Sequence, residues 1–343
     1  MASARTKAPT ILDIAVEAGV SKSAVSRALL GQGEVSAPTR ERIERAAEKL
    51  GYVANAMARG LVSSRTKTLG VVLRDVTRPF YAELQAGMQI QAEKRGYQIV
   101  TATSAGELEL TDALRALKGL ISLQVDGLAI ASAHLASDEV IPFIERVPIV
   151  VAGRRETGRG ITSVFCDDID GGRQLANHLL QLGHRNIAVL LVSRDYSLSQ
   201  NARGLSMIET VRNAGGSAMV WEVADDTASA SAVAAQLTDS NVTAIMCPTD
   251  TSMMDVLEVL RARGLSAPHD YSVTGYDGFG PLSAPYLGLT TFRQPVREIG
   301  RASIDLLIDK VEGTSSQDRL VALQGDLVVG RTAAHLGAHP PTP

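Results

Sequence analysis

The stretch TILDIAVEAGVSKSAVSRALL, residues 10–30, predicts two short helices joined by a tight turn. In its first half the apolar residues recur at intervals of three and four, the spacing of a helix with one buried face. Thr10 and Asp13 have the spacing of a capping box, so we expect Thr10 to cap the first helix. Gly19 suits a sharp turn, because glycine adopts positive φ without a Cβ clash. Ser21 then stands where a side chain would cap the second helix.

The second of these helices has a polar outer face. Its apolar residues fall on one side, whereas Lys22, Ser23, Ser26 and Arg27 fall on the other. Two helices joined by a short glycine-containing turn, the second polar on its outside, are typical of a helix-turn-helix whose second helix enters the DNA major groove. Helical hairpins with a charged outer face also occur in proteins that never contact DNA, so this stretch alone leaves both interpretations open.

Read as far as residue 70, the chain resembles the lactose-repressor (LacI) family of bacterial transcription regulators. Four ordered motifs carry the match: D-I-A-x-x-A-G-V-S-x-x-x-V-S-R-x-L at 13–29, V-S-x-x-T-R-x-R-I at 35–43, L-G-Y at 50–52 and N-x-x-A-R-x-L at 55–61. The resemblance continues almost to the C-terminus. It implies a DNA-binding head of three helices, a hinge, and an effector core similar to periplasmic sugar-binding proteins.

Residues of the head and hinge form the predicted DNA-binding set: Thr10, Ser21, Lys22, Ser23, Ser26, Arg27, Asn55, Arg59 and Leu61. Lys22, Ser23 and Arg27 are expected to reach base edges. Phosphates are the expected partners of Ser21, Ser26 and Asn55.

The hinge candidate is Asn55–Ser63. A helix this short is marginal in water, so we expect it to fold only when two copies meet on DNA. The resemblance implies that Leu61 enters the central minor-groove step and kinks the duplex. Without the resemblance, a plain linker would be the preferred interpretation. Ala54 stands where many relatives have proline, and Gly60 where they usually carry a side chain, and both departures suggest a looser hinge.

Composition indicates a protein able to bury a sizeable core. The chain has 343 residues, 45% of them apolar, and no run of eighteen residues without a charge. No signal peptide opens the sequence, so a cytoplasmic location is expected. Cys166 and Cys247 each lie in an apolar run and are expected to be reduced core residues.

The net charge of −3 conceals an asymmetry along the chain. Residues 1–67 hold 11 Lys and Arg against six Asp and Glu, whereas the remainder holds 23 against 31. A basic head on an acidic body places any contact with a polyanion at the N-terminus.

From Leu69 onward the pattern changes to alternating strands and helices. Strands are predicted at 69–73, 97–102, 125–131, 148–153, 163–168, 186–192, 218–223, 243–247, 271–277 and 287–292, with helices between them and at 295–312. Nearly continuous apolar strands between amphipathic helices predict parallel sheets covered on both faces. This many units exceeds one open sheet, so we predict an α/β core of two subdomains with a cleft between them. The helix at 295–312 is expected to return to the first subdomain.

The predicted domain boundaries follow from this organisation. They are 1–54 for the helix-turn-helix head, 55–66 for the hinge, 67–335 for the effector-binding and dimerisation core, and 336–343 for a disordered tail.

Polar residues that follow the predicted strands are candidates for a ligand site, because ligands of open α/β sheets bind beyond the carboxyl ends of the strands. They are Arg74, Asp75, Ser104, Arg154, Tyr196, Thr249, Asp250, Asp277 and Gln294. Arg203, at the start of the helix after Tyr196, is expected to face the same opening. Each of these residues alone could equally cap a strand end or form a surface ion pair.

The resemblance implies roles for part of this site. Phe80 and Tyr81 match an aromatic pair that stacks on effectors, and Arg203 and Asp277 match residues that bind them. The complete predicted effector-binding set is Asp75, Phe80, Tyr81, Arg154, Tyr196, Arg203, Thr249, Asp250, Asp277 and Gln294. An arginine with carboxylates and an aromatic platform suits a polyhydroxylated molecule, so we predict a small sugar or polyol rather than a purine.

Two departures from the family pattern leave the identity of the ligand open. Thr249-Asp250 stands where relatives often have asparagine-aspartate, and Gly153 where they sometimes have aspartate.

These patterns predict a ligand-responsive transcription regulator, with a repressor as the preferred form. It would bind a palindromic double-stranded DNA operator as a homodimer, and its effector would close the cleft and change hinge order. An activator or a purine-type co-repressed regulator of the same fold is the alternative. The core alone would also fit a solute-binding receptor. Against this interpretation, the sequence opens without a signal peptide and has a basic head that such a receptor would not need. An enzyme is not predicted, because G-x-S-x-G, H-E-x-x-H and P-loop motifs are missing, and no cofactor, metal or membrane partner is expected.

Overall fold

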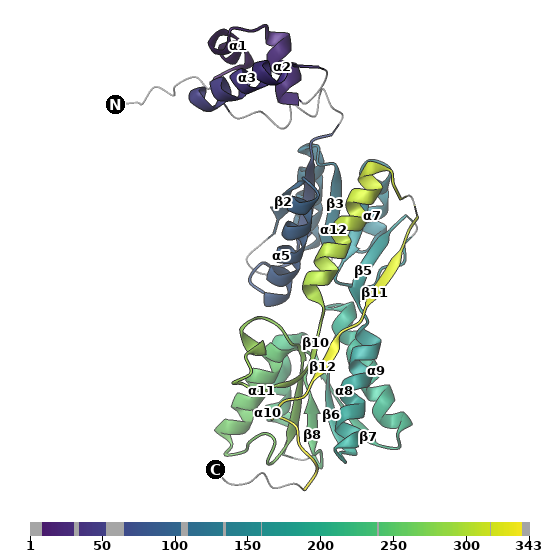
Figure 1. The fold of residues 1–343 in the computed structure, drawn as a ribbon. Coiled ribbons are helices and arrows are strands. Elements are labelled where there is room, and N and C mark those ends of the chain that lie inside the picture. Colours follow the sequence, from purple (N-terminus) through teal and green to yellow (C-terminus); the bar gives the residue numbers. More distant parts are fainter. Residues whose placement is uncertain are drawn as a thin grey trace, which may run out of the picture. The chain divides into compact units, whose positions relative to one another are not determined.

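The computed structural model describes residues 9–30, 34–52, 65–103, 109–132, 135–158, 160–238, 240–315 and 317–337. They form two compact units (Figure 1). The N-terminal unit consists of the described residues up to Thr68 together with the short segment Ser122–Asp126, and the core consists of all the other described residues. The hinge candidate at 55–63 lies outside the described residues, and so do its predicted DNA-binding members Asn55, Arg59 and Leu61. Ala54, Gly60 and Ser104 lie outside them as well. The predicted domain boundaries remain predictions.

The N-terminal unit contains α1 (Ile11–Ala18), α2 (Lys22–Leu30) and α3 (Ala37–Leu50). The predicted capping box is present, because the Thr10 hydroxyl accepts from the N–H of Asp13 over 3.4 Å and the N–H of Thr10 donates to the Asp13 carboxylate over 2.7 Å. Gly19 ends α1 with φ of +61°, which confirms the predicted turn. The Ser21 hydroxyl caps α2 by accepting a hydrogen bond from the N–H of Ala24 over 3.1 Å.

All three helices contribute to one small apolar core. Ile14 of α1, Val25 of α2 and Ile43 of α3 are fully buried at its centre. An ion pair of 2.6 Å between Lys49 and Glu17 also joins α3 to α1. Because this unit has so few buried side chains, each helix depends on the other two for its stability.

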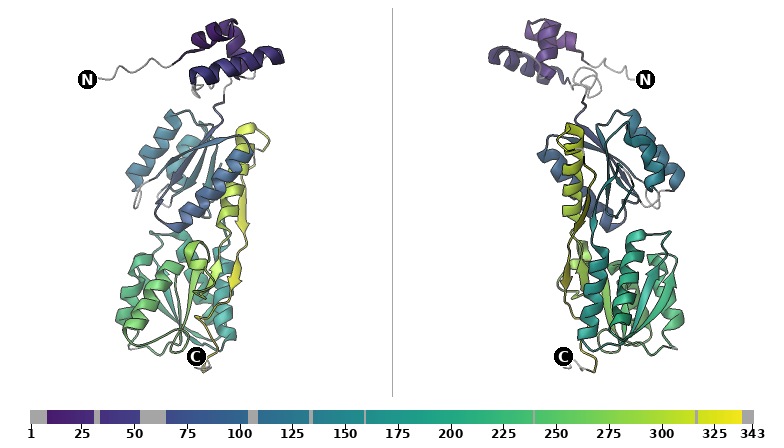
Figure 2. Two further views of the ribbon diagram at one scale, coloured as in Figure 1. Left: turned by 60° about the vertical axis from the view of Figure 1, so that its left-hand side comes forward. Right: turned by 90° about the vertical axis from the view of Figure 1, so that its right-hand side faces the viewer.

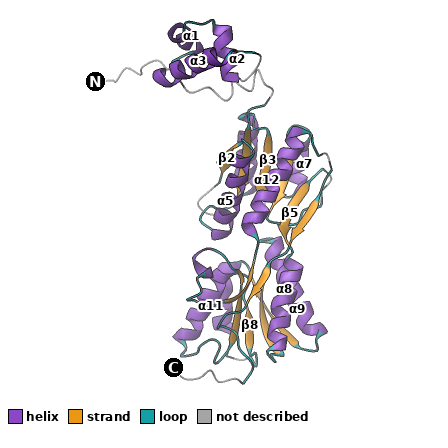
Figure 3. Ribbon diagram, viewed as in Figure 1, coloured by secondary structure: helices purple, strands orange, loops and turns teal. Residues whose placement is uncertain are grey.

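The core contains two subdomains, each with a six-stranded sheet (Figure 3). Subdomain A has the strand order β11-β5-β4-β3-β1-β2. Its strands are β1 (Thr68–Leu73), β2 (Gln98–Ala102), β3 (Gly127–Ala131), β4 (Ile149–Ala152), β5 (Thr162–Cys166) and β11 (Leu320–Leu323). Its helices are α5 (Pro79–Lys94), α6 (Leu110–Ser122), α7 (Ser137–Ile144) and α12 (Val296–Glu312).

Subdomain B has the strand order β12-β10-β9-β8-β6-β7. Its strands are β6 (Asn186–Val192), β7 (Ser217–Val223), β8 (Ala244–Met246), β9 (Ser272–Asp277), β10 (Thr290–Arg293) and β12 (Asp326–Val328). Its helices are α8 (Asp168–Gln181), α9 (Leu198–Asn213), α10 (Ser229–Gln236) and α11 (Asp250–Ala262), with short 3₁₀ turns η1 (Asp226–Ala228) and η2 (Gly280–Ser283).

The chain passes between the subdomains three times, after β5, after β10 and after β11. The predicted return of the 295–312 helix to the first subdomain is confirmed, because α12 packs against α5, β3, β4 and β5. The C-terminal segment, yellow in Figure 2, therefore contributes to both subdomains.

Several strand ends differ from the prediction: β3 begins at Gly127 rather than at residue 125, and β10 begins at Thr290 rather than at residue 287. The strand predicted at 163–168 ends at Cys166, because the Asp167 carboxylate accepts a hydrogen bond from the N–H of Asp170 over 3.0 Å and so caps α8. The short strands β11 and β12 were not predicted, and β12 pairs with β10 in the antiparallel direction. Both are three or four residues long, too short for alternation to stand out from a loop.

The two cysteines are buried free thiols, as predicted. Burial raises the pKa of the Cys166 thiol to about 12, so it stays protonated at neutral pH. In the described part of the chain, no helix is long and apolar enough to cross a membrane.

Candidate functional site

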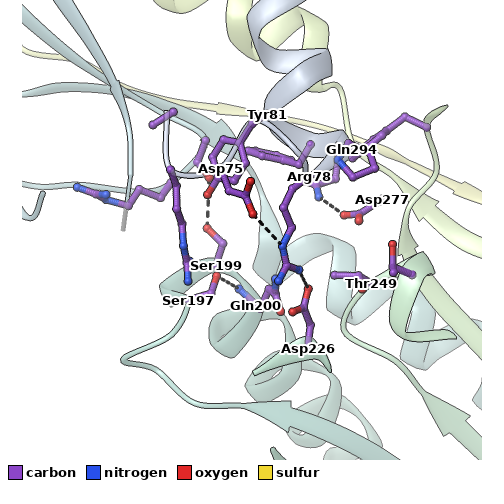
Figure 4. A pocket seen from close by; sticks show the side chains of 18 of the residues that line it. Asp75, Arg78, Tyr81, Ser197, Ser199, Gln200, Asp226, Thr249, Asp277 and Gln294 are labelled. Carbon is purple, nitrogen blue, oxygen red and sulfur yellow. Dashed lines mark hydrogen bonds and ion pairs between the residues drawn. The ribbon is translucent and has the colours of Figure 1, made fainter. Parts of the chain in front are cut away.

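A pocket lies between the two subdomains of the core, at the carboxyl ends of their strands (Figure 4). The register of the sheets produces this arrangement: Leu73 of β1 pairs with Ala131 of β3, so Arg74, Asp75 and Ser132 emerge together at one edge of subdomain A. All the residues of the predicted effector-binding set line this pocket, as does Arg74. The fold therefore brings side chains that are more than 200 residues apart in the sequence together at the strand ends, where the strand-end rule predicts them.

Arg203 is a buried cation that lines the pocket from subdomain B. Its Nε donates to the Asp168 carboxylate over 3.0 Å, and one terminal nitrogen donates to the carbonyl of Pro248 over 3.0 Å. The guanidinium also lies 3.7 Å above the ring of Tyr276, and one of its nitrogens is 3.8 Å from an Asp277 oxygen. Because a buried charge needs partners on every side, these contacts fix the orientation of the guanidinium toward the pocket.

Two carboxylates of subdomain B lie in different environments. Asp250 is only 2% exposed and accepts from the N–H of Gly278 over 2.8 Å and from the Thr291 hydroxyl over 2.6 Å. Burial raises its pKa to about 6 in spite of these bonds. The Asp277 carboxylate accepts from the Gln294 amide over 2.8 Å, and burial raises its pKa as well, against the opposing effect of Arg203. Asp250 thus holds the loop after β9, whereas Asp277 faces the pocket with less of its hydrogen-bonding capacity used.

Aromatic rings reach the pocket from both subdomains. Phe80 lies 5.2 Å from Tyr81 in an edge-to-face arrangement and 6.4 Å from Phe279 of subdomain B. A Cβ at Gly153 would lie 2.9 Å from the Phe80 ring, so this glycine leaves the space that the ring occupies. The departure at Gly153 is therefore coupled to the position of the aromatic platform.

Arg154 belongs to the pocket wall on the side of subdomain A. Its guanidinium donates to the carbonyls of Ser132 and Leu135 and forms an ion pair of 3.3 Å with Glu156. Its Nε and the Ser132 hydroxyl nevertheless have no hydrogen-bond partner among the described residues, although both are buried. Gln200 Oε1, across the pocket on α9, is unpartnered in the same sense. Buried polar atoms without partners usually mark a place where a ligand or an ordered water completes the bonding.

Several pocket residues were not predicted from the sequence. They are Arg78, Ser197, Ser199, Gln200, Asp226 and Phe279. The strand-end rule, extended to β7, would have found Asp226, which follows that strand by three residues. Arg78 adjoins the aromatic pair in R-P-F-Y, and Phe279 follows Asp277 by two residues, but no pattern distinguished them from ordinary loop residues.

The outer face of α2 is the predicted contact surface for DNA. Lys22, Ser23 and Arg27 are exposed, and Ser26 is half-buried. Ser21 and Thr10 are engaged as helix caps, so any contact they make with DNA would use the remaining capacity of their hydroxyls. A polar helix face on a small packed head has the geometry that major-groove readout requires.

Family models match the chain in two adjoining regions. Residues 10–55 match "Bacterial regulatory proteins, lacI family", and residues 66–325 match "Periplasmic binding proteins and sugar binding domain of LacI family". The chain belongs to the LacI family. As a LacI-family protein it is a ligand-responsive, DNA-binding transcription regulator and not an enzyme, which confirms both predictions.

Similar LacI-family proteins span nearly its whole length. The HTH-type transcriptional regulator CelR of Thermobifida fusca is 32% identical over 95% of this chain and 98% of its own. The repressor CytR of Escherichia coli K12 is 29% identical over 89% of this chain and 91% of its own.

Solved structures of the LacI family share the fold. A lac repressor dimer bound to operator and an anti-inducer has a TM-score of 0.83 at 24% identity, covering 96% of this chain and 100% of that one. The complex of the regulator CelR with cellobiose has a TM-score of 0.67 at 29% identity, covering 95% and 100%.

Proposed function

We propose that this LacI-family regulator is a repressor that binds a palindromic operator as a homodimer in the cytoplasm. Its effector is a small, uncharged sugar or polyol held in the pocket between subdomains A and B. Binding changes the relative positions of the subdomains, and so the order of the two hinge segments and the affinity for DNA. A ligand shifts this equilibrium only by its difference in affinity for the two states.

The observation that carries the proposal for the effector is the chemistry of the pocket wall. Buried polar atoms of Ser132, Arg154 and Gln200 lack partners within the described residues, and hydroxyl groups of a sugar both donate and accept. Phe80 and Phe279 supply apolar faces from opposite subdomains, which suits the C–H face of a sugar ring.

Charge balance supports an uncharged ligand. The wall holds four arginines and four aspartates: Arg74, Arg78, Arg154 and Arg203, and Asp75, Asp226, Asp250 and Asp277. Because burial already raises the pKa of Asp250 and Asp277, an anionic ligand such as a sugar phosphate would raise these pKa values further, whereas a neutral sugar would not.

The dimer and the palindrome follow from the size of the head. One α2 helix spans only a few base pairs, and two heads related by a two-fold axis read half-sites about one helical turn apart. The proposed base contacts are Lys22, Ser23 and Arg27. Contacts with the sugar-phosphate backbone of the DNA are proposed for Ser21, Ser26, Asn55, Thr10 and Arg59. Leu61 is proposed to insert between base pairs in the minor groove. Two relatives support the proposal of a dimeric repressor. CytR is named a transcriptional repressor, and the lac repressor structure is a dimer bound to its operator.

A thermal-shift screen of the full chain tests the effector class. Neutral sugars and polyols, among them cellobiose, ribose, glucose and sucrose, are compared with sugar phosphates and purines. A ligand at 100 times its Kd stabilises the folded state by about 2.7 kcal/mol, which raises Tm by a few degrees. We expect at least one neutral sugar or polyol to do so. A rise in Tm with purines or phosphates alone would contradict the proposed class.

Replacing Arg27 by alanine tests the base contact. We expect specific operator binding to weaken by about 1–3 kcal/mol and discrimination to relax at one base pair, while binding to random DNA changes far less. Binding is measured by fluorescence anisotropy on operator variants. Arg45→Ala on α3 is the matched control, because Arg45 has a side chain 68% exposed and its loss removes the same charge. Equal weakening on specific and random DNA would make Arg27 a phosphate contact instead.

A further inference from the structure

We propose that the ion pair between Arg78 and Asp226 is a latch that holds subdomains A and B closed over the pocket. Arg78 acts as a positioning residue: it fixes Asp226 and Tyr196 at the rim and does not have to touch the ligand. The proposal rests on the proposed function only in treating the pocket as the effector site. The closure itself is a property of the protein without ligand.

Both partners of the pair have fixed backbones in different subdomains. Arg78 precedes α5 in subdomain A, and its carbonyl accepts from the N–H groups of Tyr81 and Ala82 over 3.1 and 3.4 Å. Asp226 belongs to η1 in subdomain B, and its carbonyl accepts from the hydroxyls of Ser229 and Ser252 over 2.9 and 2.8 Å. Each side chain therefore extends from an anchored point, so the contact between them reports the distance between the subdomains.

The contact itself is short and largely shielded from water. A terminal nitrogen of Arg78 lies 2.6 Å from an Asp226 oxygen, and the other Asp226 oxygen accepts from the Tyr196 hydroxyl over 2.8 Å. The Arg78 side chain is 32% exposed whereas that of Asp226 is 5% exposed, so the carboxylate is shielded from water and the guanidinium only in part; Figure 4 shows the two side chains pointing toward each other. When the subdomains separate, both charged groups become hydrated but the ion pair between them is lost. Hydration offsets part of the lost attraction, so the pair favours the closed arrangement while still allowing it to open.

The Arg78–Asp226 ion pair joins the two subdomains, whereas other buried or half-buried arginines form their ion pairs within one subdomain. Arg95, Arg154 and Arg297 form pairs within subdomain A, and Arg203 forms its pairs within subdomain B. Arg74 also contacts subdomain B at the same rim, since it donates to the Tyr196 carbonyl over 2.8 Å and stacks 4.3 Å above the Tyr196 ring. Two arginines of the β1–α5 loop thus meet two loops of subdomain B, the β6–α9 loop at Tyr196 and η1 at Asp226, which are joined by the Tyr196–Asp226 hydrogen bond. In the proposed latch, a ligand enters or leaves the pocket when this contact breaks.

The test measures the distance between subdomains in the full chain without ligand. Spin labels are attached at Lys118→Cys on α6 and Arg212→Cys on α9, both exposed, and distances are measured by pulsed electron paramagnetic resonance. Labelled chain is mixed with an excess of unlabelled chain, so that the labelled dimers carry one labelled protomer and distances between protomers do not contribute. Cys166 and Cys247 are buried and do not compete for the label. We expect one main distance in the parent protein and an additional, longer-distance population of at least a fifth of the molecules in Arg78→Gln.

Matched variants separate a latch from a general loss of stability. Arg297→Gln removes an ion pair of 2.5 Å with Glu83 inside subdomain A and is expected to leave the distances unchanged. The charge reversal Arg78→Asp with Asp226→Arg is expected to restore the parent distance, whereas Asp226→Arg alone is not. Unchanged distances in Arg78→Gln, or an equal change in Arg297→Gln, would overturn the latch.

A kinetic measurement links the latch to the effector. With a sugar found in the thermal-shift screen, we expect dissociation from Arg78→Gln to be at least tenfold faster than from the parent protein, and dissociation from Arg297→Gln to be unchanged. If no sugar binds the parent protein, the proposed function fails while the distance measurement still decides on the latch. If a sugar dissociates at the parental rate from Arg78→Gln, the latch is wrong and the effector class stands.

Discussion

Replacing Arg203 by methionine is expected to lower the free energy of unfolding by about 3–5 kcal/mol and to abolish effector binding. The stability is lost because burial already raises the pKa of Asp168, whose side chain is 10% exposed, and without its cationic partner this carboxylate either stays charged and unpaired or has to take up a proton. Binding is lost because the guanidinium orients donors toward the pocket from between Asp168 and Tyr276. Urea denaturation measures the first effect and isothermal titration with the identified sugar measures the second.

Arg212→Met is the matched control for this prediction. Arg212 lies on the same helix, α9, but is exposed, so its replacement should change stability by about 0.5 kcal/mol or less. The double variant Arg203→Met with Asp168→Leu should recover part of the stability without recovering binding, because it removes the stranded charge but not the need for donors. Full sugar affinity in Arg203→Met would show that the arginine is a structural ion-pair member only.

Replacing Gly300 by valine is expected to destabilise the core by about 3 kcal/mol. Gly300 lies where α12 crosses α5, and a Cβ there would lie 2.4 Å from the carbonyl oxygen of Leu84. A Cβ at Gly87, on the opposite helix, would lie 2.2 Å from the carbonyl oxygen of Arg297. Because both obstacles are backbone atoms, no side-chain rotation relieves the clash and the helices must move apart. Chemical denaturation followed by circular dichroism measures the loss.

Gly119→Ala provides the contrast within the same subdomain. Gly119 lies in α6 and a Cβ there meets no atom within 4 Å, so alanine should stabilise the helix by roughly 0.5–1 kcal/mol. We therefore expect the free energy of unfolding to fall in Gly300→Val and to rise in Gly119→Ala. If Gly300→Val were as stable as the parent protein, the close contact between α5 and α12 would not exist in solution.

Local patterns were sufficient to predict the first two helices of the head and the ten strands β1 to β10 along the chain. The capping box at Thr10, the turn at Gly19 and the cap at Ser21 are each set by neighbours three or four residues away, so the sequence contains all the partners involved. The buried parallel strands were predicted for a similar reason, since long apolar runs are visible without knowledge of the fold. The pocket residues at strand ends followed from a rule of topology.

The missed features depend on contacts between distant parts of the chain. Arg78 and Asp226 are 148 residues apart, and neither belongs to a pattern that marks it as a partner of the other. Strands β11 and β12 exist because neighbouring strands of two different sheets offer them edges, and their own residues carry little strand signal. The apolar run predicts a strand that extends to Asp168, whereas Asp167 caps α8 and Asp168 begins that helix. The strand pattern therefore gives no sign that Asp168 is the partner of Arg203.

Coupling between the pocket and the head is the central claim, and an anisotropy titration of DNA with the full chain tests it most directly. The operator is selected from a random pool by the protein itself, and the titration is run with and without the sugar that raises Tm. The predicted result is a change of at least tenfold in the Kd for this operator, with little change for random DNA. A sugar that saturates the pocket while the Kd for the operator stays the same would contradict the account.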